Sequence, residues 1–187
     1  MINNKQDLKE YLEQDRIALH QTRKKPKFFG DEIWKYEIVL RKCEYYKNCN
    51  KKIRFIFAKY KFHKLSIKYN FSIPLNCFDK GLSIAHIGTI VVNSEAKIGQ
   101  NCRIQEMVNI GATNGTSESP QIGNNVFIGT GAKLIGKIKI ADNVAIGANA
   151  VVVKDIVEPN TTWAGVPAHK ISNKDSKTFI DARLFNK

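Results

Sequence analysis

The sequence after residue 74 repeats with a period of six residues, and this repeat restricts the chain to very few folds. A bulky, mostly aliphatic residue opens each unit, a small or β-branched residue follows four positions later, and glycine often stands second. Repetition at a fixed period indicates stacked units and outranks local helix or strand signals. The opening positions are Pro74, Lys80, His86, Val92, Ile98, Ile104, Ile110, Ile122, Ile128, Leu134, Ile140, Ile146 and Val152.

A six-residue unit of this kind predicts a parallel β-helix. Each unit supplies one short strand and one corner, with the bulky side chain pointing inward and glycine relieving the corner. Three units close one triangular coil, so residues 74–170 predict about five coils. Residues 111–121 lack the apolar pattern but keep the phase, because Ile122 follows Ile110 by two units. We therefore expect this segment to form a loop, and a loop on a rigid scaffold is a common place for a functional site.

The first 73 residues have a different composition. They hold 18 of the 30 basic residues and 8 of the 17 acidic residues, which gives a net charge of +10 within a total of +13. They also hold 13 of the 18 aromatic residues but only one of the 12 glycines. The chain therefore divides into a basic α-helical domain over residues 1–73, a β-helix domain over residues 74–170, and a polar tail over residues 171–187 that carries no clear signal.

Three helices are expected in the first domain. One runs around residues 5–20, and a second carries an apolar stripe of Ile33, Tyr36, Leu40 and Cys43. The third, over residues 50–69, is apolar on more than one face, as in a helix that packs on two partners or lies in a membrane interface. Its basic and aromatic residues 51–68 suggest peripheral membrane contact, and a solvated helical surface is the simpler alternative. No nucleic-acid-binding module is present, so no nucleic-acid partner is expected.

Composition excludes several other classes. No apolar run approaches the roughly 18 residues of a membrane span, and the first residues contain no hydrophobic region of signal-peptide type. The four cysteines, Cys43, Cys49, Cys77 and Cys102, show no metal-ligand spacing. We therefore expect reduced thiols, no metal site, and a cytoplasmic protein that could work at the inner face of the membrane.

Five segments of the repeat region carry a family resemblance. They are residues 81–93 (GLSIAHIGTIVVN), 108–111 (VNIG), 120–123 (PQIG), 128–133 (IGTGAK) and 164–168 (AGVPA). These segments resemble the left-handed β-helix acyltransferases with hexapeptide repeats, and among them the serine acetyltransferase branch. The basic helical front resembles the shorter members that modify surface polysaccharides. The resemblance implies a left-handed β-helix, acetyl-CoA as the acyl donor, a hydroxyl acceptor, and a homotrimer with active sites between neighbouring prisms. Pairing of two trimers stays open.

His86 is the residue that matches the family's general base. A neutral imidazole with a pKa near 6.5 suits proton removal from a hydroxyl that attacks a thioester. A histidine at an otherwise aliphatic opening position is an exception that needs a reason, although a buried core histidine is the simpler explanation. The family orients its histidine with an aspartate about fifteen residues earlier, where this chain has Phe71, and carries another directly before it, where this chain has Ala85. Another residue must then orient the imidazole, and the resemblance suggests Glu106 as a second catalytic candidate, because its aligned position lies close to the catalytic cavity in the family; an exposed corner glutamate is the alternative.

The resemblance also suggests a coenzyme-binding set. Small residues let the pantetheine arm approach the backbone, and lysines suit its phosphates. Each of these residues also has an ordinary role in a corner or on a solvated surface, and the tryptophan could simply cap the last coil. The candidates are Ala112, Thr130, Gly131, Ala148, Lys133, Lys154, Trp163 and Lys170.

The acceptor is inferred from loop residues that differ from the serine acetyltransferase pattern. Serine acetyltransferases carry Arg-His before the proline that matches Pro120, whereas this chain has Glu118 and Ser119. Replacing an arginine by an acid disfavours a carboxylate substrate. We therefore expect an O-acetyltransferase for a sugar hydroxyl of a cell-surface polysaccharide, with Asn109, Asn114, Glu118 and Ser119 near the acceptor. A serine O-acetyltransferase is the alternative; N-acetyl transfer to an amino sugar and a non-catalytic scaffold are further ones.

Overall fold

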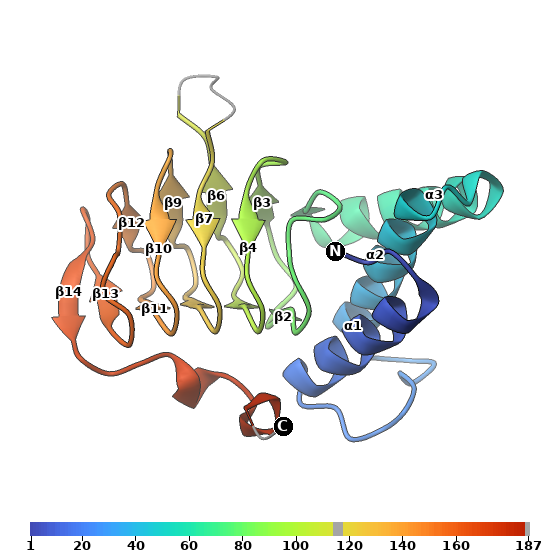
Figure 1. Cartoon of the computed structure of the whole chain (residues 1–187), viewed down its shortest axis with the longest axis horizontal. Coiled ribbons are helices and arrows are strands. Elements are labelled where there is room, and N and C mark those ends of the chain that lie inside the picture. Colours follow the sequence, from blue (N-terminus) through green and yellow to red (C-terminus); the bar gives the residue numbers. More distant parts are fainter. Residues whose placement is uncertain (114–117, 186–187) are drawn as a thin grey trace.

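A computed structural model describes residues 1–113 and 118–185, and it places three helices at one end of a three-sided parallel β-helix (Figure 1). The helices are α1 (Lys5–Ala18), α2 (Glu32–Asn48) and α3 (Lys52–Tyr69). The prism and its C-terminal extension contain β1 (Phe71–Ser72), β2 (Ser83–Ile84), β3 (Ile90–Val92), β4 (Lys97–Ile98), β5 (Arg103–Ile104), β6 (Asn109–Gly111), β7 (Gln121–Ile122), β8 (Phe127–Ile128), β9 (Lys133–Ile135), β10 (Lys139–Ile140), β11 (Ala145–Ile146), β12 (Val151–Val152), β13 (Thr162–Ala164), β14 (His169–Ser172), η1 (Lys177–Phe179) and η2 (Ala182–Leu184).

Three parallel sheets form the faces of the prism. The first sheet has the order β1-β3-β6-β9-β12, and the second has β4-β7-β10, extended at its two ends by bridges at Phe78 and Ile156. The third has β2-β5-β8-β11-β13, and β14 adds to it antiparallel to β13. Every coil thus contributes one segment to each face, so the five segments per face confirm the predicted parallel β-helix of about five coils. Coil 1 comprises β1, Phe78 and β2, and coil 4 comprises β9, β10 and β11.

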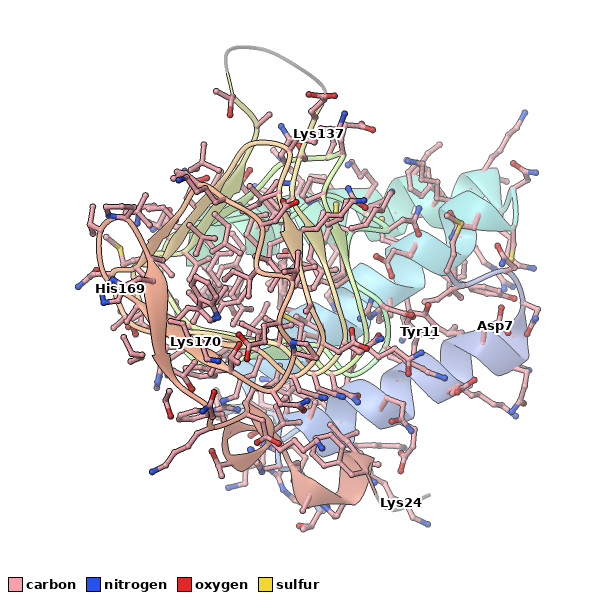
Figure 2. The ribbon with its side chains drawn as sticks, turned by 60° about the vertical axis from the view of Figure 1, so that its left-hand side comes forward. Asp7, Tyr11, Lys24, Lys137, His169 and Lys170 are labelled. Carbon is pink, nitrogen blue, oxygen red and sulfur yellow. The ribbon has the colours of Figure 1, made fainter. Side chains whose placement is uncertain are left out.

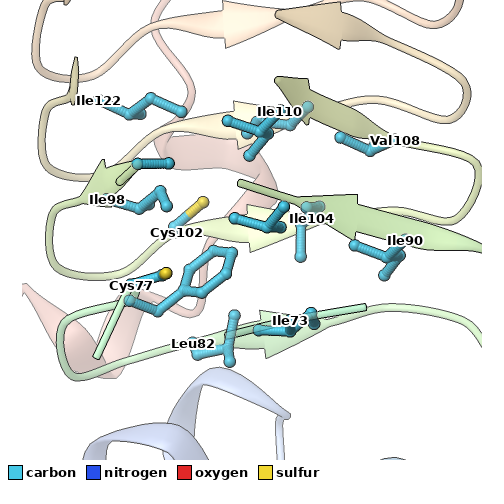
Figure 3. Packing of buried hydrophobic residues seen from close by; sticks show 14 of the residues in the cluster. Ile73, Cys77, Leu82, Ile90, Ile98, Cys102, Ile104, Val108, Ile110 and Ile122 are labelled. Carbon is cyan, nitrogen blue, oxygen red and sulfur yellow. The ribbon is translucent and has the colours of Figure 1, made fainter. Parts of the chain in front are cut away.

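Aliphatic side chains in register fill the interior of the prism. Ile84, Ile104, Ile128 and Ile146 pair in series along one face, and each is almost completely buried. Figure 3 shows such packing in the first coils, where Cys77 and Cys102 are buried among the aliphatic side chains. Each fully buried aliphatic side chain contributes about 1.5–3 kcal/mol, so the repeat itself supplies the core.

A ladder of asparagines stabilises one corner of the prism. The side-chain amides of Asn101, Asn125 and Asn143 each donate to the next asparagine in the series, with Asn160 last, at 2.8–2.9 Å. All four residues have φ between 55° and 59°, in the left-handed region where asparagine is tolerated better than most residues. The tight corner thus explains why asparagine recurs at this position of the repeat.

Buried carboxylates from the helices close the open end of coil 1. Strands inside the prism bond to the coils on either side, but coil 1 has no coil below it. Asp15, Glu37 and Glu44 are buried and accept hydrogen bonds from its backbone N–H groups at 2.7–3.0 Å. The donors are Asn76, Gly81, Leu82 and Ile84. The helices therefore supply the acceptors that a further coil would have supplied.

Arg41 is the basic partner of these acids. Its side chain is fully buried, and it pairs with Asp15 at 2.7 Å and with Glu44 at 3.0 Å. It also donates to the carbonyl oxygens of Phe78 and Asp79 at 2.8 and 2.7 Å. The charged side chains of the helices and the backbone of coil 1 thus form one hydrogen-bonded network.

The structure places the ends of the prism slightly differently from the sequence prediction. Parallel pairing begins at Phe71, which pairs with Ile90, so β1 lies before the expected start at residue 74. The tail, which carried no signal, runs back along the prism to α1 (Figure 1). There Ile180 and Leu184 pack against Ala18. In the described part of the chain, no helix is long and apolar enough to cross a membrane.

Candidate active site at an edge of the β-helix

His86 lies in a corner that is two residues longer than the repeat requires. Ile84 pairs with Ile104, and Val92 pairs with Ile110. Val92 follows Ile84 by eight residues, whereas Ile110 follows Ile104 by six. Ile84 points inward and is buried, whereas His86 is exposed on the outer edge. The expectation that His86 occupies an inward position is wrong, because the two extra residues move it out of the aliphatic register. The buried-core explanation fails for the same reason.

The same shift affects two earlier positions. Phe78, and not Lys80, bridges to Ile98, and Ile73, and not Pro74, is buried. The opening positions predicted at residues 74, 80 and 86 were therefore wrong by one or two residues, whereas those from Val92 onward are correct.

Glu106 lies directly against the corner of His86. A Cβ built on Gly88 would stand 2.9 Å from the Glu106 Cβ, so only glycine allows this close approach. The Glu106 Oε1 accepts a hydrogen bond from the Thr130 hydroxyl at 3.0 Å, and among the described residues its buried Oε2 has no partner. Met107 and Ile87 flank the corner as exposed apolar side chains. The corner therefore combines an exposed imidazole and an apolar rim with a buried carboxylate oxygen that has no partner among the described residues.

The corners of the following coils stack on this one and form a continuous edge of small residues. The Gly131 N–H donates to the Glu106 carbonyl at 2.9 Å, and the Asn149 N–H donates to the Thr130 carbonyl at 2.8 Å. Ala148 lies beside Asn149 and is exposed. The structure thus brings Thr130, Gly131 and Ala148 to the edge that also carries His86 and Glu106.

The cationic candidates are dispersed. Lys133 lies at the His86 edge, where its ammonium donates to the carbonyl oxygens of Met107 and Gly131 at 3.0 and 2.6 Å. Lys154 is exposed after β12, at a different corner. Lys170 lies on β14 and pairs with Glu158 (Figure 2).

Trp163 is part of the last coil. It pairs in register with Ile146, packs against the core, and donates from Nε1 to the Thr161 hydroxyl at 2.9 Å. These contacts fit a cap on the end of the prism.

The acceptor candidates lie mainly at the loop, one strand away from the His86 edge. Ser119 is buried where the loop returns to the prism, and Ala112, a coenzyme-binding candidate, follows β6 where the loop leaves it. Glu118 pairs with Lys137 at 2.5 Å, and Figure 2 shows Lys137 at the foot of the loop. Asn109 opens β6, the strand that separates the two corners. Asn114 lies outside the described residues.

Sequence reasoning missed two features of this region. Gly88 carries the close approach of Glu106, and the longer spacing between Ile84 and Val92 was the signal that could have revealed it. Lys137 was missed because a single lysine in a strand-to-strand corner has no distinctive pattern; its pairing with Glu118 depends on the fold.

Comparison with known proteins identifies the class of fold. The family model "Bacterial transferase hexapeptide (six repeats)" matches residues 119–154. The serine acetyltransferase of Escherichia coli K12 is 35% identical over 117 residues, which cover 61% of this chain and 42% of that protein. The chain thus spans less than half the length of this relative.

Solved structures extend the likeness to most of the chain. Serine acetyltransferase from Brucella abortus, in complex with coenzyme A, has a TM-score of 0.68 at 26% identity, over 91% of this chain and 70% of that one. Soybean serine acetyltransferase complexed with serine has a TM-score of 0.71 at 26% identity, over 89% and 70%. The chain is therefore a left-handed β-helix protein with hexapeptide repeats. Its homologues are serine acetyltransferases.

These findings correct the expected acceptor. The homologues are named serine acetyltransferases, which contradicts the surface-polysaccharide assignment and favours the serine alternative. The physical error lay in treating Glu118 as an isolated negative charge. The ammonium of Lys137 lies beside that carboxylate, so repulsion of a carboxylate substrate no longer follows from Glu118 alone.

Proposed function

We propose that this chain is an acetyl-CoA-dependent serine O-acetyltransferase in which His86 is the general base. The observation that carries the proposal is the exposed imidazole in the lengthened corner, at one end of an edge made of small residues. The names of the homologues supply the donor and the acceptor.

In the proposed reaction, His86 accepts the proton of the serine hydroxyl as its oxygen attacks the thioester carbonyl carbon. The carbon–sulfur bond then breaks, and the departing sulfur takes the proton back from the imidazolium, which leaves O-acetylserine and free coenzyme A. Direct transfer fits the cysteines, since burial raises the pKa of Cys102 to about 12 and that of Cys77 to about 11. Both stay protonated at neutral pH and are poor nucleophiles.

Glu106 is the proposed positioning residue for the imidazole. Phe71, at the place of the family's orienting aspartate, is buried in β1 and packs on Tyr36 with ring centroids 4.9 Å apart, so it offers no acceptor. The Glu106 carboxylate shares the corner with His86 and keeps one oxygen without a partner among the described residues. An imidazole N–H is a suitable donor to that oxygen, and because the oxygen is buried and His86 is exposed, the two side chains must reorient to meet.

The edge of small residues would hold the pantetheine arm of acetyl-CoA. Thr130, Gly131 and Ala148 place little side-chain bulk between the arm and the backbone, and a narrow arm can then use backbone groups for orientation. Lys133 stands on the same edge, where its ammonium would meet anionic oxygens of the coenzyme after exchanging its carbonyl partners. Lys154, Lys170, Trp163 and Ala112 lie away from this edge, so a role for them requires a neighbouring chain.

A trimer would join the two separated corners. Serine is a zwitterion, and the Glu118–Lys137 pair offers one carboxylate and one ammonium of opposite sign to its charged groups. In this chain the pair and His86 lie at different corners. The loop nevertheless leaves the prism after β6, within about two coils of His86, or roughly 10 Å along the axis. We therefore propose a homotrimer in which the loop of one copy faces the His86 corner of the next.

The test measures coenzyme A release and O-acetylserine formation with L-serine, D-serine, L-threonine and a set of neutral sugars. We expect turnover with L-serine, and His86→Ala should reduce it by about 10²–10⁴-fold. His63→Ala on α3 is the matched control and should retain activity. Glu118→Gln and Lys137→Gln should raise KM for serine and leave KM for acetyl-CoA unchanged.

Four results would contradict separate parts of the proposal. Acetylation of a neutral hydroxyl without any acetylation of serine would overturn the acceptor. Full activity of His86→Ala would overturn the base. A Glu106→Gln variant whose pH–rate profile matches the unmodified protein would remove Glu106 from its positioning role. An active monomer in light scattering would overturn the shared site.

A further inference from the structure

The outer face of α3 carries exposed apolar side chains. The opposite face packs inward through Phe62 and Tyr69, which are buried. The outer residues recur at steps of three, four and seven, as expected for one stripe of a helix. They are Ile53, Ile56, Phe57, Tyr60 and Ile67, which are 74%, 65%, 73%, 64% and 63% exposed. The helix points away from the prism (Figure 1), so the chain itself leaves this stripe uncovered.

Basic residues of α3 flank the stripe and α3 itself carries no acidic residue, although Glu95 of the prism lines a groove beside Ile67. From Tyr45 to Phe78 the chain holds eight lysines and arginines and no aspartate or glutamate. The six basic side chains of α3 are all exposed, namely Lys52, Arg54, Lys59, Lys61, Lys64 and Lys68. An apolar stripe between rows of cations is the pattern of a helix that lies in the interface of an anionic membrane.

A second basic and aromatic segment lies close to α3. In the segment Lys24–Phe29, the adjacent rings of Phe28 and Phe29 are 87% and 83% exposed. A groove of about 590 Å³ joins this segment to α3, and its lining includes Lys25, Lys35, Lys42 and Lys61 but no acidic residue. Lys35 pairs with Glu32 at 3.3 Å, which leaves the ammonium groups of Lys25, Lys42 and Lys61 to meet the phosphates of lipid headgroups, with the exposed rings beside them.

Charge argues against a second copy of this chain as the occupant of the stripe. Two copies of α3 placed face to face would bring twelve cations together with no acidic partner on either helix. A nucleic acid would match the charge but would leave the aliphatic stripe exposed to water.

We propose that the outer face of α3, together with the segment Lys24–Phe29, docks on an anionic phospholipid surface. The apolar side chains enter the boundary between headgroups and acyl chains, and the lysines contact lipid phosphates. This proposal does not depend on the proposed enzymatic activity, because its readout is binding alone.

Cosedimentation of the full chain with phosphatidylglycerol–phosphatidylcholine vesicles tests the proposal. We expect at least about tenfold stronger partitioning than to pure phosphatidylcholine, and a marked decrease with added salt. Ile56→Ser/Phe57→Ser should weaken binding about tenfold or more. The control Val157→Ser removes an equally exposed apolar side chain from the prism and should bind normally.

Charge variants separate the contributions of lipid and simple polyanion binding. Lys61→Gln/Lys64→Gln should weaken vesicle binding, whereas Lys97→Gln/Lys139→Gln on the prism should have little effect. Equal binding to charged and neutral vesicles would overturn the proposal. It would also be overturned if Ile56→Ser/Phe57→Ser bound vesicles normally while duplex DNA competed fully, since the face would then be a polyanion site. Self-association that those two substitutions abolish, without vesicle binding, would assign the face to a second copy.

Discussion

Coil 1 and coil 4 of the β-helix are built from the same six-residue unit but are held in different ways. In coil 4, the positions Leu134, Ile140 and Ile146 keep the period, and neighbouring coils satisfy its strands on both sides. In coil 1, buried charges from the helices replace one neighbouring coil, and the corner that follows has two extra residues. A regular coil therefore needs only the repeat, whereas the coil that carries His86 depends on residues far away in the sequence.

The largest expected effect concerns the charged closure of coil 1. Arg41→Ala would leave Asp15 and Glu44 buried without their basic partner, and should lower the free energy of unfolding by about 3–5 kcal/mol. Arg16→Ala, which breaks the half-exposed pair with Glu13 and a hydrogen bond to the Gln21 carbonyl, should cost at most about 2 kcal/mol. Urea unfolding measures both. Equal losses would show that the end of the prism is not held by buried charge.

Shortening the His86 corner tests whether the broken period matters for activity. Deletion of Ile87 and Gly88 restores the six-residue spacing and should preserve the β-helix, but it moves the imidazole. A misplacement of about 1 Å can reduce turnover about 10²-fold, so we expect at least this loss. Circular dichroism checks the fold, and the length-preserving Thr89→Ser is the control. Normal turnover after the deletion would mean that the extra residues have no catalytic purpose.

Gly88→Ala tests the close approach within that corner. The added Cβ would meet the Glu106 Cβ at 2.9 Å, and such overpacking costs about 1–3 kcal/mol. Gly111→Ala is the milder comparison, because its Cβ would meet the ends of two side chains, Asn109 Oδ1 at 3.0 Å and Ile135 Cδ1 at 3.4 Å. Thermal unfolding should rank Gly88→Ala below Gly111→Ala, and the reverse order would contradict the assigned packing.

The smallest expected effect is a pH dependence of folding stability that arises at coil 1. Burial, with the nearby charge of Asp15, raises the pKa of Glu37 well above its ordinary value of 4.5, although Arg41 and Arg103 oppose the shift. A raised pKa contributes stability that is present below pH 4.5 and is lost as the pH rises through the folded-state value. Glu37→Gln should therefore gain stability relative to the unmodified chain as the pH rises above 4.5, as measured by urea unfolding over a pH series. A difference independent of pH would contradict a buried titrating Glu37.

Part of the candidate site was predictable from the sequence. His86 and Glu106 were singled out, and the structure places them at one edge with Thr130, Gly131 and Ala148. Their close approach through Gly88 was not predicted. Counting residues 74–86 in steps of six hid the two extra residues between Ile84 and Val92. The ion pair of Glu118 was also missed, and that omission produced the wrong acceptor. Lys137 is distant in sequence, and only the stacking of coils brings it to the loop.

The sequence by itself determined the prism, because a six-residue period with inward aliphatics and recurrent corner asparagines buries a core only when the units coil and stack. It also determined the three helices, through the periodicity of their apolar residues. Only the tertiary structure decided how coil 1 is closed and which way His86 points. Both depend on contacts between segments remote in the chain, such as Asp15 with Gly81, and such contacts leave no periodic pattern.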